Sequence, residues 1–167
     1  GVTVAVIDAG SFDADHEDLE ENVILTYNAD NNNNNVSDTT DDASHGSTVA
    51  GFIASPLNGK GLVGAAPKAK LILIQQTYDD DVLTIRAFEY AKNNGAKLIN
   101  CSWGTNNVSE TIADYFQELK DEGITIIFAS GNNGCNMDEN YRTSIDGNII
   151  CTQNLGSPFN DESELDS

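Results

Sequence analysis

The sequence predicts an α/β fold: a three-layer αβα sandwich with a mostly parallel sheet. The first observation behind this prediction is a series of short apolar runs that are continuous rather than alternating, which is typical of strands covered on both faces. The second is that segments with a helical period lie between several of these runs. The length of 167 residues is that of one ordinary domain.

Six apolar runs predict the strands. They are Val2–Ile7, Val23–Tyr27, Leu71–Ile74, Leu98–Cys101, Ile124–Ala129 and Ile149–Cys151. Three segments predict helices. A short apolar helix is expected over Thr48–Ala54, a second where Val82, Ile85, Phe88 and Ala91 recur before Asn93-Asn94-Gly95, and a third where Ile112, Phe116 and Leu119 precede Gly123.

Two segments depart from this pattern. Residues Asp30–Asp42 contain a run of asparagines and four acids without apolar periodicity, so we expect a surface loop in which the asparagines are a tolerated insertion. From Ser157 onward the chain is polar and acidic. We therefore expect a domain over residues 1–156 and an acidic tail over 157–167.

The charge balance excludes some classes of function. Against 27 acidic residues stand only 8 lysines and arginines, a net charge of −19, whereas phosphate binding needs clustered basic side chains. We expect no nucleic acid partner, and an anionic membrane surface is disfavoured for the same reason. No apolar run approaches the ~18 residues of a membrane span. The odd count of three cysteines excludes a fully paired disulfide framework, and their spacing matches no zinc pattern.

Asp8 and His45 are the first candidates for chemistry. Asp8 ends the first predicted strand, and ligands of open α/β sheets bind at the carboxyl ends of strands; an Asx turn explains such an aspartate equally well. His45 precedes the Thr48–Ala54 helix, where the helix N-terminus disfavours an imidazolium. A carboxylate such as Asp8 would be needed to stabilise that charge, and an exposed structural imidazole is the alternative. His16, among acidic residues, is expected at the surface.

Two later strand ends carry further candidates. Asn132, between glycines in Gly131-Asn-Asn-Gly134, could donate its amide to an anion, although turn chemistry also explains this motif. Ser102-Trp103-Gly104 follows the fourth strand and offers a backbone edge.

Taken together, these segments resemble the subtilisin-like serine proteases. The segments that resemble the family are Val4-Ala-Val-Ile-Asp8-Ala-Gly10, His16-Glu-Asp18-Leu19, His45-Gly-Ser-Thr-Val-Ala-Gly51, Gly61-Leu-Val-Gly-Ala-Ala-Pro67, Asn100-Cys-Ser102-Trp-Gly104 and Ala129-Ser-Gly131-Asn132-Asn-Gly134. Their order and intervals agree over nearly the whole chain.

The resemblance implies a role for each matching residue. Asp8 would orient His45, the general base and then general acid, and Asn132 would donate to the oxyanion. The edge formed by Ser102, Trp103 and Gly104 would pair with an extended polypeptide substrate. Asp18 and Asn58 match positions that hold structural calcium in many members, and no organic cofactor is expected. Trp103 stands where a smaller aliphatic residue is commoner.

One family feature has no match in this sequence. The nucleophile of the family lies in Gly-Thr-Ser-x-Ala, and no serine here has that context. We therefore expect a secreted serine endopeptidase represented by a partial domain that is incomplete at its C-terminus, with the nucleophile in a segment beyond it. The alternatives are an inactive homologue that binds peptides and an acidic, cation-binding α/β domain. Cys135 as a nucleophile has little support.

Overall fold

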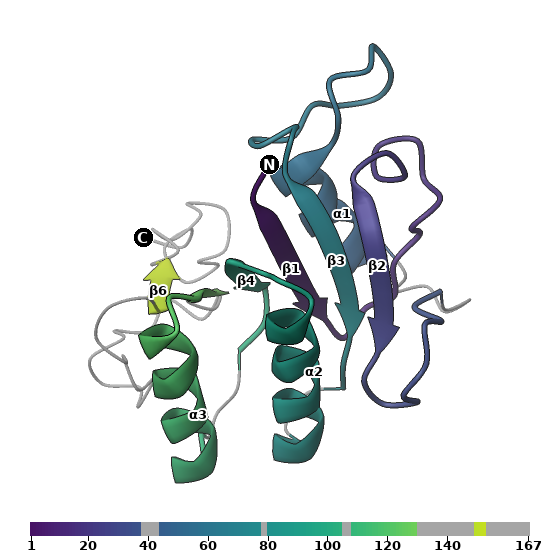
Figure 1. The fold of residues 1–167 in the computed structure, drawn as a ribbon. Helices are drawn as coiled ribbons and strands as arrows, with labels where there is room; N and C mark the ends of the chain where they lie inside the picture. Colours follow the sequence, from purple (N-terminus) through teal and green to yellow (C-terminus); the bar gives the residue numbers. More distant parts are fainter. Residues whose placement is uncertain (38–43, 78–79, 105–107, 130–148, 153–167) are drawn as a thin grey trace, which may run out of the picture.

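The computed structural model describes residues 1–37, 44–77, 80–104, 108–129 and 149–152 (Figure 1). Its elements in chain order are β1 (Thr3–Asp8), β2 (Val23–Asn28), α1 (Ser44–Ala54), β3 (Lys70–Gln75), α2 (Asp81–Asn93), β4 (Leu98–Cys101), α3 (Glu110–Asp121), β5 (Thr125–Ala129) and β6 (Ile149–Thr152). The strands form one sheet in the order β2-β3-β1-β4-β5-β6, and every neighbouring pair is parallel. The predicted fold class is confirmed.

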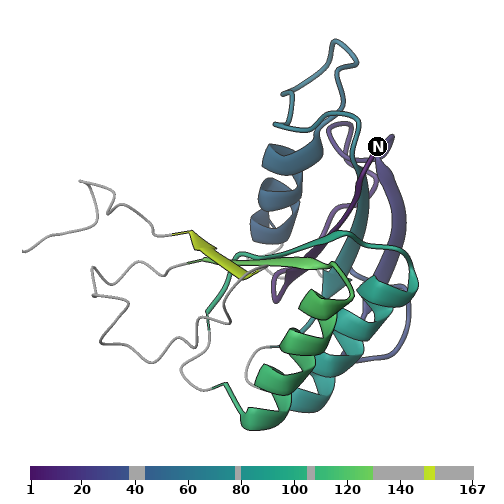
Figure 2. The same cartoon turned by 60° about the vertical axis from the view of Figure 1, so that its left-hand side comes forward.

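The helices lie in two layers on opposite faces of the sheet (Figure 2). Side chains alternate along a strand, so β1 sends Val4 and Val6 into a core with α1, and Ala5 and Ile7 into a larger core with α2 and α3. The next residue on the α1 face of β1 is Asp8. The alternation therefore directs this carboxylate toward α1.

The crossover that contains α1 has the opposite hand to the other two. Each of the connections β2–α1–β3, β3–α2–β4 and β4–α3–β5 moves in the same direction across the sheet. Since α1 covers one face and α2 and α3 the other (Figure 2), the connections cannot all share the right-handed sense that nearly all parallel crossovers have. This exception places α1 on the face to which Asp8 points.

Helix α1 begins at Ser44, four residues before the predicted start at Thr48. The first turn of α1 is held by the segment between β1 and β2, because the Asp13 amide donates to Ser47 Oγ at 2.8 Å. The small residues Ala50 and Ala54 are fully buried and allow α1 to lie close to the sheet.

The apolar stripe of α2 differs from the predicted one. Its buried residues are Thr84, Ala87, Phe88 and Ala91, whereas Val82 is 65% exposed. A strict three-residue spacing drifts around a helix of 3.6 residues per turn, so Val82 lies roughly 120° from Phe88. The stripe of α3, with Ile112, Phe116 and Leu119 buried, is confirmed. Both predicted stop signals hold, since Gly95 and Gly123 follow α2 and α3 with φ of 83° and 81°.

The asparagine run is hydrogen-bonded to the edge strand β2. Asn28 forms an antiparallel bridge with Asn33, and its side-chain amide donates to the Asn35 carbonyl at 3.0 Å and to Gln75 Oε1 at 2.8 Å. Asn32 has φ 51°, a left-handed conformation that asparagine tolerates. The expected surface loop is present up to residue 37: its asparagines, residues 31–35, are exposed, and the loop is hydrogen-bonded to the edge strand β2.

Several predicted features lie outside the described residues. These are residues 38–43 of the loop, Asn132, Cys135 and the tail 157–167, and only the backbone of Cys151 is described, within β6. Among the described residues, no helix is long and apolar enough to cross a membrane.

Candidate active site

Asp8 ends the interior strand β1. The chain leaves β1 toward β2 on one side of it and leaves the neighbouring strand β4 toward β5 on the other side. Where two adjacent strands connect in opposite directions, ligands bind beside the strand ends. The Asp8 side chain is 1% exposed, and a buried charge needs hydrogen-bond partners. Oδ1 accepts from the Gly10 amide at 2.9 Å, which is the Asx turn that the sequence left open.

The second carboxylate oxygen of Asp8 contacts His45. Nδ1 of His45 lies 2.8 Å from Oδ2 of Asp8, which is hydrogen-bond reach and is what an orienting role for Asp8 requires. Since an ionised carboxylate only accepts, Nδ1 carries the hydrogen and the neutral ring keeps its lone pair on Nε2. The His45 side chain is 56% exposed. The imidazole therefore has one edge fixed on a buried charge and the other edge near solvent.

This pair has the geometry of a general base with its orienting carboxylate. A proton taken up at Nε2 would make the ring cationic, and the buried Asp8 charge would stabilise that cation. The position of His45 in the first turn of α1 acts in the opposite direction, because the helix dipole disfavours a positive charge there. At 2.8 Å in a partly buried setting, the carboxylate is the closer and stronger influence.

Residues 12 and 13 hold the helix turn that carries His45. The Phe12 ring is 1% exposed, and a Cβ added at Gly46 would lie 2.8 Å from its Cε1 atom. Only glycine therefore lets the ring pack against this turn. The Asp13 amide bonds to Ser47 Oγ, as described above. Sequence reasoning did not identify Phe12 or Ser47 as parts of the site; the glycine directly after His45 was the available signal.

The segment Ser102-Trp103-Gly104 lies directly after β4, the strand next to β1. Ser102 Oγ accepts from the Asn100 side-chain amide at 3.0 Å. The Trp103 side chain points into the protein, where it is 7% exposed and its Nε1 donates to the Ile7 carbonyl at 2.9 Å. Its backbone rather than its ring is therefore the part that could meet a peptide.

Cys101 lies near Asp8 but is not suited to nucleophilic chemistry. Burial, and secondly the charge of Asp8, raise the pKa of its thiol well above the ordinary range. The thiolate is the nucleophilic form, so the protonated, buried Cys101 is a core residue.

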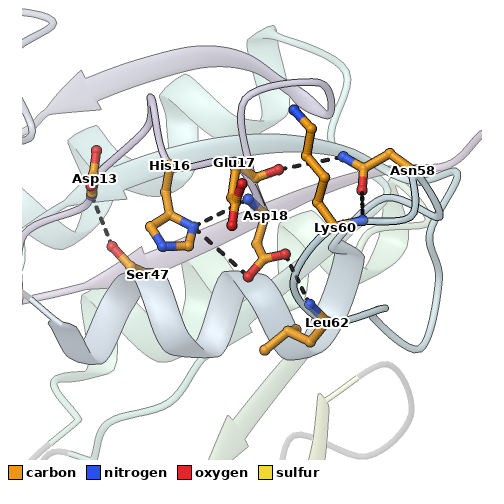
Figure 3. A network of polar contacts seen from close by, with 8 residues as sticks. All are labelled: Asp13, His16, Glu17, Asp18, Ser47, Asn58, Lys60 and Leu62. Atoms are coloured by element: carbon orange, nitrogen blue, oxygen red, sulfur yellow. Dashed lines mark hydrogen bonds and ion pairs between the residues drawn. The ribbon is translucent and has the colours of Figure 1, made fainter.

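The predicted calcium residues Asp18 and Asn58 belong to one polar network over α1 (Figure 3). Asp18 Oδ1 accepts from the Leu62 amide at 3.0 Å. Asn58 Oδ1 accepts from the Lys60 amide at 3.0 Å, and its Nδ2 donates to Glu21 Oε1 at 2.9 Å. The network thus ties the loop after α1 to the loop before β2.

In this network a side-chain oxygen of each predicted calcium ligand already accepts a hydrogen bond from a loop amide. Calcium takes six to eight oxygens, and among the described residues no three His, Cys, Asp or Glu side chains converge as a metal site. Calcium also binds amide and backbone carbonyl oxygens, so the calcium site stays a prediction. His16 is 50% exposed, as expected, and its Nδ1 accepts from the Asp18 amide at 3.1 Å.

The fold and the site together define a class: α/β proteins in which a buried carboxylate at a strand end is hydrogen-bonded to a histidine on a helix. Comparisons with known proteins identify the family. The model of the subtilase family matches residues 1–162. The chain belongs to the subtilase family.

Individual relatives agree with this assignment. Fervidolysin from Fervidobacterium pennivorans is 34% identical over 161 residues, which is 89% of this chain and 23% of that protein. Subtilisin BL from Lederbergia lenta is 32% identical over 138 residues, which is 80% of this chain and 49% of that protein. The crystal structure of fervidolysin superposes with a TM-score of 0.66 at 33% identity, covering 80% of this chain and 22% of the other. The chain thus spans less than half the length of these relatives.

Proposed function

We propose that this chain carries the acid–base part of the catalytic centre of a subtilisin-like serine endopeptidase, a hydrolase that cleaves polypeptides. Membership of the subtilase family supports the protease class. The observation that carries the proposal is the 2.8 Å contact between His45 Nδ1 and Asp8 Oδ2. In this reaction His45 takes the proton of a serine hydroxyl as that oxygen attacks the peptide carbonyl, and then returns it to the leaving amine.

Three further parts complete the proposed site. Asn132 donates to the oxyanion of the tetrahedral intermediate, a contact for which about 10²–10³ in rate is measured in subtilisin itself. The substrate pairs by its backbone with Ser102, Trp103 and Gly104. The nucleophilic serine belongs to a Gly-Thr-Ser-x-Ala segment that is not among these 167 residues.

The test compares two proteins with a fluorophosphonate probe of serine hydrolases. The 167-residue chain should not react, and a protein in which a Gly-Thr-Ser-x-Ala segment continues it should label at one site and hydrolyse a fluorogenic peptide. His45→Ala should abolish both in the extended protein. Stoichiometric, His45-dependent labelling of the 167-residue chain would refute the claim that its own serines are not nucleophiles.

The second candidate is an inactive homologue that binds peptides. The paired Asp8 and His45 favour the enzyme, because a binding module has no need of a buried charge that must be matched by an imidazole. The reading frame that encodes the protein discriminates the two. A Gly-Thr-Ser-x-Ala run in it favours the protease, and a stop directly after Ser167 favours the homologue.

We also propose secretion and a structural calcium site, both of which rest on weaker support. For secretion, a relative 31% identical over 147 residues is named a minor extracellular protease. The support for calcium is that Asp18 accepts a hydrogen bond from Leu62 in the loop of residues 58–62, the loop that begins with Asn58 (Figure 3). The remaining oxygens would come from groups outside this pair.

A further inference from the structure

Trp103 joins the proposed substrate edge to the strand that carries Asp8. Pairing between β1 and β4 ends at Ile7 and Cys101. Just beyond that end, the Trp103 indole donates from Nε1 to the Ile7 carbonyl at 2.9 Å in a buried setting. This carbonyl belongs to the same peptide group as the Asp8 nitrogen.

The backbone of Asp8 is held from both neighbouring strands. On the β3 side the Asp8 carbonyl accepts from the Gln76 amide at 2.9 Å. On the β4 side the hydrogen bond from Trp103 fixes the peptide before it. Rotation of this peptide would swing the Asp8 carboxylate, so the indole restricts the direction in which Oδ2 reaches His45.

The indole itself is fixed by an aromatic neighbour on a third strand. The Trp103 and Phe128 rings meet edge to face, with centroids 5.4 Å apart and an interplanar angle of 88°. Such contacts have a preferred geometry, and Phe128 lies in β5. The Trp103 side chain therefore contacts β1 and β5, while its backbone belongs to the proposed substrate edge of residues 102–104.

We propose that Trp103 is a positioning residue for the Asp8–His45 pair and couples the backbone of residues 102–104 to the orientation of Asp8. This inference rests on the proposed function. The buried ring acts through the Ile7–Asp8 peptide rather than on substrate. Phenylalanine and leucine are smaller than tryptophan and have no N–H group, so neither can make this hydrogen bond.

The experiment removes the N–H group. Trp103→Phe does this by mutation and keeps an aromatic side chain, although a smaller one. Since Trp103 is the single tryptophan of the chain, growth on benzothienylalanine, which has sulfur in place of the N–H, does the same with almost no change of shape. This second route remains open if the Phe variant fails to fold.

The first readout is the proton NMR signal of His45 Nδ1–H, which is shifted far downfield by a hydrogen bond to a carboxylate and does not depend on hydrolysis. Without the indole N–H, this signal should move upfield or broaden. Phe128→Leu is the matched control: it removes the ring contact but leaves the indole donor, and the signal should move less than in the two variants that lack the N–H. An unchanged signal in both variants that lack the indole N–H, Trp103→Phe and the benzothienylalanine protein, would overturn the proposal.

The second readout is the kinetics of the protein extended by its serine segment. Loss of the indole N–H should lower kcat about 10-fold or more, because small misplacements of catalytic groups are costly, and should shift the pH profile of kcat while KM changes little. A lower kcat without any shift in the profile would assign Trp103 a structural role only. If the unsubstituted protein hydrolyses nothing, the proposed function fails, whereas the NMR comparison still decides the role of Trp103.

Discussion

The carboxylate of Asp8 and the imidazole of His45 lie 2.8 Å apart although 37 residues separate them in the sequence. Their meeting depends on the alternation along β1, which points Asp8 to one face, and on the unusual hand of the crossover that brings α1 to the same face. The pair is thus a product of topology rather than of local sequence.

Replacing Asp8 by asparagine tests its orienting role. Asp8→Asn keeps the shape but removes the charge that stabilises the His45 cation and fixes its tautomer. In the serine-extended protein we expect kcat to fall by about 10⁴-fold, the loss known for this change in a triad. The measurement is kcat on a fluorogenic peptide. The control is Asp15→Asn at an exposed aspartate, and a fall of similar size there would mean that net charge, not orientation, matters.

Replacing Gly46 by alanine tests whether Phe12 holds the turn that carries His45. The new Cβ would lie 2.8 Å from Phe12 Cε1, and the buried ring has little space to move. We expect a loss of about 1–3 kcal/mol in the free energy of unfolding, the usual cost of overpacking, measured by urea titration.

The matched control for Gly46 lies five residues further along the same helix. At Gly51 an added Cβ would lie 3.3 Å from Ser55 Oγ, a contact that a small shift relieves. Gly51→Ala should change stability little, or raise it by up to about 1 kcal/mol through helix propensity. Equal losses at both glycines would contradict a specific role for Phe12.

Features of the fold that depend on local sequence could be predicted, whereas features that depend on contacts between distant residues could not. Apolar runs and stop glycines placed the strands and helices to within a few residues, because burial and backbone conformation are local consequences of residue type. The early start of α1 was missed because it depends on a contact between Asp13 and Ser47. The inward turn of Trp103 was missed for the same reason: its partner is the Ile7 carbonyl, 96 residues away.

The asparagines near β2 should differ widely in their importance for stability. Asn28 makes three side-chain hydrogen bonds, two as donor and one as acceptor from the Asn31 amide. Asn28→Ala should therefore cost about 2–3 kcal/mol, at roughly 1 kcal/mol per bond. Asn31→Ala, at an exposed side chain, should change stability by less than about 0.5 kcal/mol. Urea midpoints of the two variants decide this, and equal values would contradict a structural role for the Asn28 hydrogen bonds.

The calcium proposal predicts a difference in melting temperature. If calcium binds the folded chain, the melting temperature should rise with calcium relative to a chelator. Asp18→Asn should remove most of that rise, while Asp15→Asn should retain it. Because Asp18 also accepts from the Leu62 amide, the variant is expected to melt lower even with chelator present. A melting temperature that does not respond to calcium in the unsubstituted chain would end the proposal.

Tyr115 should make the protein sensitive to alkali. Burial raises the pKa of Tyr115 to about 12, from 10.0, and among the described residues its hydroxyl has no hydrogen-bond partner. Between these two values the unfolded chain releases the proton while the folded chain keeps it. The unfolded state then binds fewer protons, so the free energy of unfolding falls as the pH rises.

Tyr115→Phe should remove this contribution. Below pH 10.0, the ordinary tyrosine pKa, the variant should be as stable as the unsubstituted protein or more so, since it loses an unpartnered hydroxyl. Above that pH its advantage in urea midpoint should grow, because only the unsubstituted chain has this proton to lose on unfolding. Urea titrations on both sides of the tyrosine pKa measure the difference. An advantage that is the same at both pH values would mean that the Tyr115 hydroxyl ionises equally in the folded and unfolded states.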